Sequence, residues 1–260
     1  MNGTFTVKDG ALTAYSGNDT VITVDEGIVA IENSTFKGCT SLKEIILPST
    51  LRKIGFFAFE NCTSLTSITV PEGVRSILNN AFYGCTALSE VSLPSTLSML
   101  STSLFYGCTS LRSLVLPEGL RFIAFSALSN VLGLTELVIP STVQEIGNGA
   151  FSSCTALKRI YWEARQPRLD EGIFSGIAHD FEIIFSGSGD EARAIFSPYT
   201  ERCESVSGDY HHSTSSHFSY QVYDKTVTPL SSSAKEPFTC RVFCRADGAA
   251  LVLTPPAKNG

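Results

Sequence analysis

The chain of 260 residues has few of the features that mark several large classes of protein. Its apolar runs are short, which excludes a membrane-spanning helix, and its first ten residues hold no apolar segment typical of a secretory signal. Nineteen basic residues against 25 acidic ones give a net charge of -6, so we expect no nucleic-acid partner. Only four histidines occur, the first at His179, so most of the chain lacks a common general base.

Cysteine is more frequent, and its placement is regular. Five of the eight cysteines fall at multiples of 23 residues: Cys39, Cys62, Cys85, Cys108 and Cys154. Val131 fills the remaining place in this row, which favours packing over a redox or metal role, because buried cysteine behaves as a small hydrophobe. We predict free thiols.

The cysteine row belongs to a 23-residue unit that runs from Phe36 to Ala58. The unit returns at Phe59, Phe82, Phe105 and Phe151, and in weaker form at Leu128 and Phe174. A fixed period of this length indicates a solenoid, in which each unit buries its apolar side chains against the next copy.

Each unit predicts one short strand followed by a second extended segment. The strand has the pattern Leu-x-x-Ile-x-Leu, whose two-residue alternation is typical of a β-strand. Equivalent strands would stack at about 4.8 Å into a parallel sheet, and a proline ends most of them. The second segment carries an apolar pair such as Leu51 and Ile54, and the return path is short enough for a tight turn or one 3₁₀ turn.

These observations divide the chain into four parts. Residues 1–20 are expected to form a cap hairpin, because Phe5 and Val7 alternate before the turn residues Asp9 and Gly10. Repeats follow over 21–185, then a cap helix over 186–198. A Ser/Thr-rich appendage over 199–260 is expected to be β-rich or partly disordered.

The unit resembles the BspA-type leucine-rich repeat family, whose pattern runs Phe-x-x-Cys-x-x-Leu-x-x-Ile-x-Leu-Pro-x-x-Val-x-x-Ile-Gly-x-x-Ala. The resemblance covers about residues 5 to 198. It implies a curved, right-handed, mainly β solenoid used for protein binding or adhesion, often on the surface of host-associated microbes, with no catalytic residues. It also implies a secreted or cell-surface protein, whereas the chain itself shows no leader, so a cytoplasmic location is the alternative.

Outward positions alternate over two units. After each proline the row reads Glu26, Ser49, Glu72, Ser95, Glu118 and Ser141. Alternation doubles the distance between carboxylates to about 10 Å and so limits repulsion between neighbouring strands. The simplest interpretation is a soluble surface, and the alternative is a spaced acidic surface for a basic partner.

One outward row suggests a binding surface. Between the two core positions of each strand, its C-terminal half reads Val115, Val138, Tyr161 and Ile184, with Lys158 and Arg159 beside it. A contiguous exposed apolar stripe is informative, although β-branched residues also suit any strand. We therefore predict that these six residues contact a partner.

We expect a monomeric, non-catalytic module that binds a protein and needs no cofactor or metal. The tail holds Cys203, His211, His212, His217, Cys240 and Cys244, in a spacing that matches no common zinc pattern. In a strand, Cys240 and Cys244 would lie about 13 Å apart. The alternatives are a structural spacer that carries the tail, or an enzyme or metal site confined to residues 199–260.

Overall fold

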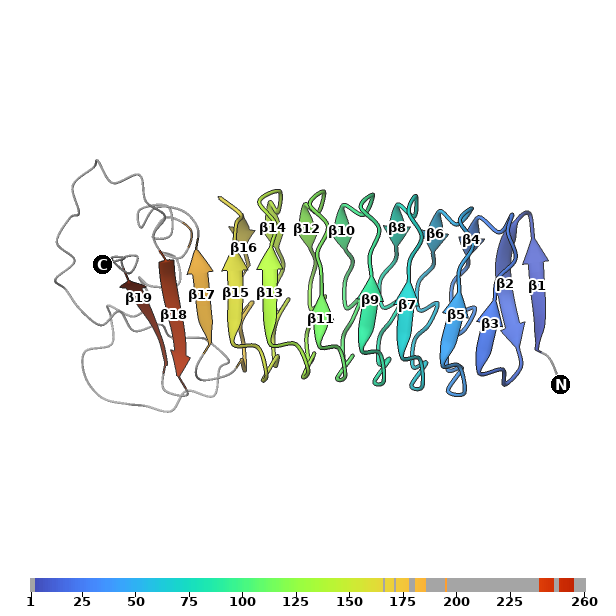
Figure 1. The fold of residues 1–260 in the computed structure, drawn as a ribbon, viewed down its shortest axis with the longest axis horizontal. Coiled ribbons are helices and arrows are strands. Elements are labelled where there is room, and N and C mark those ends of the chain that lie inside the picture. Colours follow the sequence, from blue (N-terminus) through green and yellow to red (C-terminus); the bar gives the residue numbers. More distant parts are fainter. Residues whose placement is uncertain are drawn as a thin grey trace, which may run out of the picture.

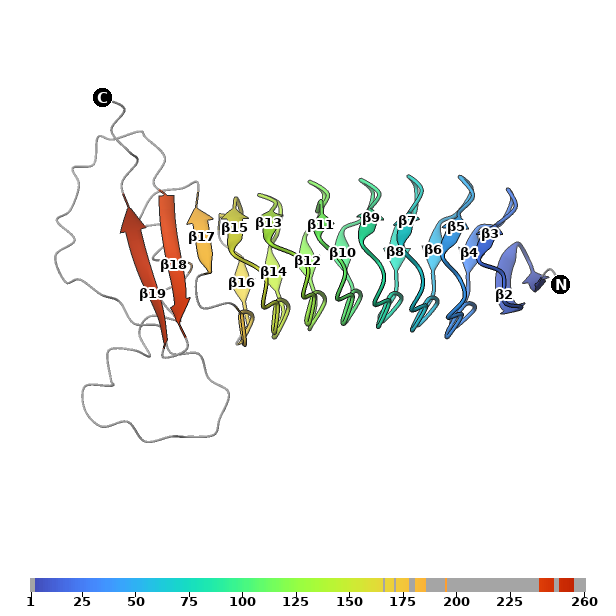
Figure 2. The same ribbon diagram turned by 60° about the horizontal axis from the view of Figure 1, so that its bottom comes forward.

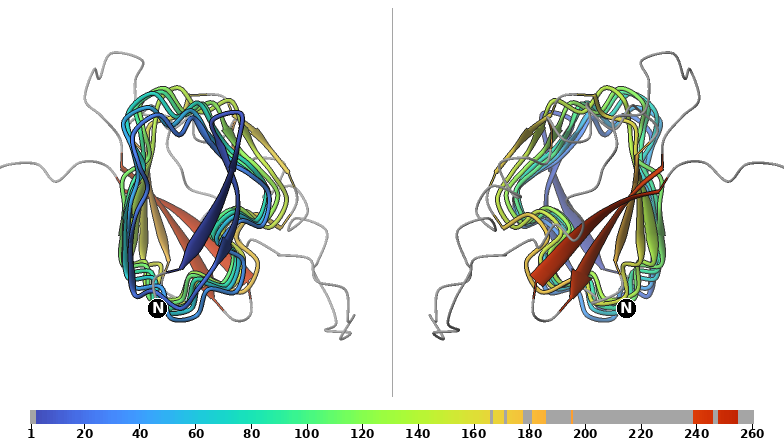
Figure 3. Two further views of the ribbon diagram at one scale, coloured as in Figure 1. Left: turned by 90° about the vertical axis from the view of Figure 1, so that its right-hand side faces the viewer. Right: turned by 90° about the vertical axis from the view of Figure 1, so that its left-hand side faces the viewer.

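The protein is a β-solenoid whose 23-residue turns, called rungs below, lie side by side along one axis (Figure 1). The structure is a computed structural model that describes residues 3–165, 167–170, 172–177, 181–185, 195, 239–245 and 248–254. Seen along the axis, the rungs superimpose, so equivalent residues form rows (Figure 3). The predicted mainly β solenoid is confirmed.

Two ladders of short strands run along the solenoid (Figure 2). The first ladder consists of β3 (Val21–Thr23), β5 (Glu44–Ile46), β7 (Ser67–Thr69), β9 (Glu90–Ser92), β11 (Ser113–Leu114), β13 (Glu136–Ile139), β15 (Arg159–Trp162) and β17 (Glu182–Phe185). The second ladder consists of β4 (Ala30–Ile31), β6 (Lys53–Ile54), β8 (Ser76–Ile77), β10 (Met99–Leu100), β12 (Phe122–Ile123), β14 (Glu145–Ile146) and β16 (Arg168–Leu169). The second extended segment predicted for each unit is therefore present.

The ladders are parallel and keep the register that the repeat predicts. Ile22 pairs with Ile45, and Leu137 pairs with Ile160, each partner 23 residues further on. Inward side chains of both ladders are buried in one continuous core. The alternation of apolar and polar residues sets this register, because a slip of one residue would turn every core side chain to the solvent.

The ladders are not continuous sheets. The first divides into the sheets β3-β5, β7-β9-β11 and β13-β15-β17, and the second divides between β8 and β10. At the β11–β13 break, Gly133 takes a place that serine or alanine fills in the other rungs. A Cβ atom on Gly133 would lie 2.8 Å from the carbonyl oxygen of Leu111. The sixth unit thus packs its backbone closely on the preceding rung at a place where the other units tolerate a side chain.

A hairpin covers the N-terminal end of the stack. Strand β1 (Thr4–Lys8) pairs antiparallel with β2 (Ala11–Ser16), and β2 in turn pairs parallel with β4 of the second ladder. Asp9 and Gly10 at the turn have φ angles of 51° and 75°, as a tight hairpin turn requires. Leu12 is buried against the first rung, whereas β1 is exposed along its length.

Phenylalanine rings stack through the core at the return path of each rung. Phe36, Phe59, Phe82 and Phe105 are fully buried, with consecutive ring centroids 5.2, 5.3 and 5.6 Å apart. The ring stack is interrupted where Leu128 takes the equivalent place and resumes with Phe151. Its regular spacing follows from the stacking of successive rungs.

In the return path, two positions of the repeat have a positive φ angle, in the left-handed region. At the first position, seven successive rungs have such a residue: Ser34, Phe57, Asn80, Ser103, Ser126, Gly149 and Gly172. The second position holds Gly38, Asn61, Gly84, Gly107, Asn130, Ser153 and Gly176. Glycine and asparagine at the second position are the residues that tolerate this backbone best, but the sequence pattern did not predict either row.

The repeat cysteines are free thiols, as predicted. The Cys62 and Cys85 Sγ atoms each donate a hydrogen bond of 3.1 Å to the carbonyl of the phenylalanine 26 residues earlier, Phe36 and Phe59 respectively. Burial raises the pKa of the Cys108 thiol to about 12. A buried neutral thiol with a carbonyl partner is a packing residue, so this row has no redox signature.

Near the C-terminal end, β18 (Thr239–Arg245) and β19 (Gly248–Thr254) form an antiparallel hairpin. Strand β18 lies beside β17 in both side views (Figures 1 and 2). The predicted cap helix over 186–198 lies outside the described residues except for Ile195, which is buried. The tail residues Cys203, His211, His212 and His217 also lie outside them.

Candidate functional site

The strand register assembles most of the predicted apolar row. Val138 on β13 pairs with Tyr161 on β15, and Tyr161 pairs with Ile184 on β17. These three positions therefore follow one another across one sheet at the ladder spacing of about 4.8 Å. The Val138 side chain is 43% exposed and Tyr161 is half-buried. The side chain of Ile184 lies outside the described part of the chain.

Val115 stands apart from the other three in hydrogen bonding. It follows the last residue of β11, on the far side of the break between β11 and β13. With 78% of its side chain exposed, it is the most exposed of the large apolar residues in the described part of the chain. It thus extends the apolar row by one rung, but without a ladder bond to Val138.

At least one of the two basic residues beside the row is already paired within the solenoid, which the sequence did not suggest. Lys158 and Arg159 are both exposed. Arg159 Nη1 lies 2.8 Å from Glu136 Oε1, one rung earlier, in an exposed ion pair. The positive charge predicted beside Tyr161 is therefore partly neutralised by the neighbouring strand.

The other rungs serve as internal controls for the apolar row. The same outward place holds Thr23, Thr69 and Ser92 elsewhere on the first ladder, all exposed. The scaffold therefore folds with polar residues at this place. Ile46 is an exception at 50% exposed, but its neighbours Thr23 and Thr69 are polar. Only in the C-terminal half do apolar residues occupy consecutive rungs.

The alternating Glu and Ser residues have a structural role that neither interpretation anticipated. The Glu26 carboxylate accepts hydrogen bonds from the Ser49 backbone N–H at 2.9 Å and the Ser49 hydroxyl at 3.0 Å. The Ser49 N–H lowers the pKa of Glu26, because it stabilises the charged form. Glutamate in one rung thus binds serine in the next, which explains a period of two units.

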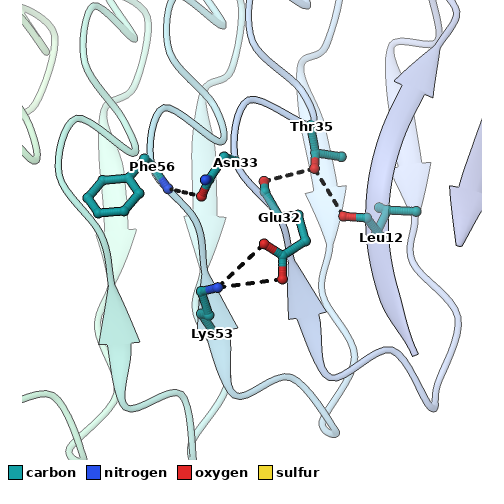
Figure 4. A network of polar contacts seen from close by, with 6 residues as sticks. All are labelled: Leu12, Glu32, Asn33, Thr35, Lys53 and Phe56. Atoms are coloured by element: carbon teal, nitrogen blue, oxygen red, sulfur yellow. Dashed lines mark hydrogen bonds and ion pairs between the residues drawn. The ribbon is translucent and has the colours of Figure 1, made fainter. Parts of the chain in front are cut away.

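Polar contacts also join the rungs at the start of the second ladder (Figure 4). Lys53 Nζ lies 3.4 Å from Glu32 Oε2, and the Phe56 backbone N–H donates to Asn33 Oδ1 at 3.0 Å. The buried Thr35 hydroxyl bonds to the Leu12 carbonyl at 3.0 Å and so connects the cap hairpin to the first rung. Each of these polar groups has its partner within the solenoid, so the network holds neighbouring rungs together.

The described residues contain no group of three or more His, Cys, Asp or Glu side chains arranged to hold a metal ion. Within the same residues, no helix is long and apolar enough to cross a membrane.

A second exposed cluster escaped the sequence analysis. Met99, Phe122 and Phe125 are exposed on and beside the second ladder. The signal was available, because the equivalent places in other rungs carry mainly polar residues such as Lys53, Ser76 and Asn148.

The stacked strands, proline turns and phenylalanine spine define a leucine-rich-repeat solenoid. A family model described as the BspA type leucine rich repeat region matches in six copies, over residues 12–130 and 76–188. The chain belongs to the BspA-type leucine-rich repeat family, as the sequence resemblance indicated. Solenoids of this family are typically non-catalytic and suited to protein interaction or adhesion. No curated protein sequence matches the chain.

Solved bacterial structures share the fold. A leucine-rich repeat protein of T. pallidum aligns with a TM-score of 0.66 and 25% identity, covering 75% of this chain and 92% of that one. A leucine-rich cell surface protein of Faecalibacterium prausnitzii A2-165 aligns with a TM-score of 0.50 and 27% identity, covering 64% of this chain and 54% of that one.

Proposed function

We propose that this protein is a non-catalytic interaction or adhesion module that binds a protein partner through the C-terminal half of its first ladder. The observation that supports the proposal most is the run of apolar residues at Val115, Val138 and Tyr161 in consecutive rungs. The earlier rungs carry threonine or serine at this place, apart from the isolated Ile46. Exposed apolar side chains cost solubility, so their retention in a row favours a surface that is buried in a complex.

The composition of this surface suits protein recognition. Tyrosine and arginine are enriched at the centres of protein interfaces, where a few such residues supply most of the binding energy. Tyr161 stands between Val138 and Ile184 in the ladder, and Arg159 lies two residues before it on β15. We therefore assign Tyr161 as the central contact and Lys158 and Arg159 as polar contacts at the rim.

The location is proposed from the family and one similar structure. The Faecalibacterium prausnitzii protein is described as a cell surface protein, and BspA-type repeats are plausible in adhesion. We propose that this chain acts at or outside the cell surface, where it would meet a protein of another cell.

The binding surface is tested by affinity capture with matched variants. Proteins recovered with the wild-type chain from host-cell surface extracts are identified by mass spectrometry, and their dissociation constants are then measured. We expect Tyr161→Ala and Val138→Ser each to raise the dissociation constant of a true partner at least tenfold, or about 1.4 kcal/mol in binding free energy. Thr69→Ala and Ser92→Ala, in the same row of other rungs, should have no effect. Equal affinity for all four variants would refute the proposed surface.

The tail supplies the competing hypothesis, in which the solenoid is a spacer. A chain that ends at residue 198 separates the two. Retained partner binding by this chain supports the solenoid as the binding element, whereas loss of binding assigns recognition to residues 199–260. Circular dichroism of the shortened chain should show an unchanged β-solenoid, because the last buried core residue among the described ones is Ile195.

A further inference from the structure

A second surface lies on the other ladder and has a different chemistry. Met99 is 42% exposed, Phe122 38% and Phe125 54%. Met99 on β10 is the direct ladder partner of Phe122 on β12, so the two side chains leave neighbouring strands about 4.8 Å apart. Phe125 follows three residues after Phe122 in the same rung, at the start of the turn.

Packing within the solenoid does not require these side chains. The row of Met99 and Phe122 holds Ala30, Lys53, Ser76, Glu145 and Arg168 in other rungs. The row of Phe125 holds Asn33, Asn79, Thr102 and Asn148, with Phe56 as a second, isolated exposed phenylalanine. The core-facing neighbours Leu100 and Ile123 are buried, like their equivalents Ile54 and Ile146 in other rungs. A scaffold that accepts lysine, serine or asparagine here gains no core from methionine or phenylalanine.

Two arginines accompany this cluster. Arg75 and Arg121 are exposed and lie at one repeat position, two rungs apart, and Arg121 directly precedes Phe122. The Arg121 backbone N–H donates to the Ser98 carbonyl at 2.8 Å, which joins its rung to that of Met99. Arg75 lies one rung further along, on the other side of the break between β8 and β10. Two rungs correspond to about 10 Å along the ladder, and Met99 lies in the rung between.

The acidic residues of this ladder are already paired with other cations. Glu32 binds Lys53 at 3.4 Å, and Glu145 binds Arg168 at 3.4 Å. Within the described part of the chain, neither Arg75 nor Arg121 has an ion pair or a side-chain hydrogen bond. The patch therefore carries two uncompensated positive charges on a protein whose net charge is -6.

We propose that Met99, Phe122, Phe125, Arg75 and Arg121, the Phe–Arg patch, bind an acidic segment of a protein partner that also carries apolar side chains. Phenylalanine, methionine and arginine are enriched in interface cores, whereas lysine, glutamate and serine are depleted there. The apolar residues supply desolvated contact area, and the arginines select carboxylates through bidentate hydrogen bonds.

A polyanion such as nucleic acid fits the patch poorly. Its affinity would depend on many cations along an extended track, whereas this patch offers two arginines around three apolar side chains. The proposal does not depend on the apolar row of the first ladder. The two ladders lie on different sides of the solenoid (Figure 3), so either surface can be disproved alone.

The test uses three fluorescently labelled 12-residue peptides and the full chain. The first alternates glutamate with phenylalanine and leucine, the second replaces glutamate by lysine, and the third replaces the apolar residues by serine. Fluorescence anisotropy at low and high salt measures their affinities. We expect the first peptide to bind at least tenfold more tightly than the other two, and to weaken as salt screens the charges.

The variants take their residues from other rungs, so that folding is preserved. Phe122→Ser and Phe125→Asn introduce the residues found at the equivalent places Ser76 and Asn148. Each variant should bind the glutamate peptide at least tenfold more weakly. Arg75→Glu combined with Arg121→Glu should abolish its binding and favour the lysine peptide. Thr69→Ala on the first ladder is the control and should leave all affinities unchanged.

Thermal melting followed by circular dichroism checks that each variant remains folded. The proposal is overturned if the glutamate peptide does not bind at 1 mM, if the lysine peptide binds equally well, or if the Phe122→Ser and Phe125→Asn variants bind like the wild type. An equal loss in the Thr69→Ala control would also overturn it, because the effect would then not belong to this patch.

Discussion

The Glu72 carboxylate binds Ser95 of the next rung through the serine hydroxyl, at 2.8 Å, and through its backbone N–H, at 3.1 Å. Both residues are exposed, and they stand 23 residues apart at the turn after the proline. The same arrangement joins Glu26 to Ser49. The pair gives the two-unit alternation a direct cause, because a glutamate acceptor in one rung needs a donor, not a second glutamate, in the next.

We expect Glu72→Ala to lower the free energy of unfolding by about 0.5–1.5 kcal/mol, the usual range for an exposed hydrogen-bonded group. Ser95→Ala should cost less, because the backbone donor remains. Urea denaturation measures both. Glu118→Ala is the matched control, since in the described part of the chain the Glu118 carboxylate makes no hydrogen bond to Ser141, its counterpart in the next rung. Equal losses for Glu72→Ala and Glu118→Ala would contradict this role.

The buried thiols predict a loss of stability at alkaline pH. Burial raises the pKa of Cys108 from 9.0 to about 12. The unfolded thiol therefore ionises first, so this stabilisation is complete below pH 9 and is lost as the pH rises toward 12. The slope contributed by one thiol approaches about 1.4 kcal/mol per pH unit.

Cys108→Val isolates this effect, because Val131 occupies the equivalent place in the sixth unit. Unfolding free energies measured from pH 7 to 11 should run parallel for the two proteins below pH 9. Above it, the wild type should lose stability more steeply. Curves that stay parallel throughout would show that the Cys108 thiol titrates alike in both states.

The phenylalanine spine should tolerate leucine better than alanine. The Phe82 ring lies 5.3 Å from Phe59 and 5.6 Å from Phe105, and all three are fully buried. Phe82→Ala should cost about 3–5 kcal/mol through the cavity it leaves. Phe82→Leu should cost clearly less, because Leu128 fills the same place in another rung. Urea denaturation with an unchanged m-value provides the comparison, and equal losses would argue against spine packing.

Gly133 should resist substitution because of its close contact with the preceding rung. A Cβ atom there would lie 2.8 Å from the Leu111 carbonyl oxygen and 3.2 Å from that of Thr109. We expect Gly133→Ala to lower the free energy of unfolding by about 1–3 kcal/mol, a typical cost of overpacking. Ser110→Ala, at the same place one rung earlier, should be nearly neutral in the same thermal or urea experiment. A stabilised Gly133→Ala protein would refute the close approach.

Much of the architecture followed from the sequence by itself. Ile22, Ile45 and Ile68 repeat at intervals of 23 with a two-residue alternation around them, and this pattern determines which side chains face the core and how the strands align. Cys85 could be read as a packing residue because its row accepts valine. Burial follows the local alternation of apolar and polar residues, and that alternation can be read directly from the sequence.

Contacts between rungs were decided only by the tertiary structure. Arg159 belongs to the predicted apolar and basic surface, but the parallel register places it against Glu136, whose carboxylate partly compensates its charge. Phe57 adopts a φ of 58°, although nothing in a bulky aromatic side chain indicates a left-handed turn. Its conformation is imposed by the stacked turns on either side.

Met99 and Phe122 illustrate the physical reason. They are 23 residues apart in the sequence and adjacent in the ladder, so the patch they form exists only once successive rungs have stacked. The sequence by itself determined the core, because each rung repeats the same inward pattern. The tertiary structure decided the surfaces, because their pairing, charge balance and exposure depend on neighbours that only the stack brings together.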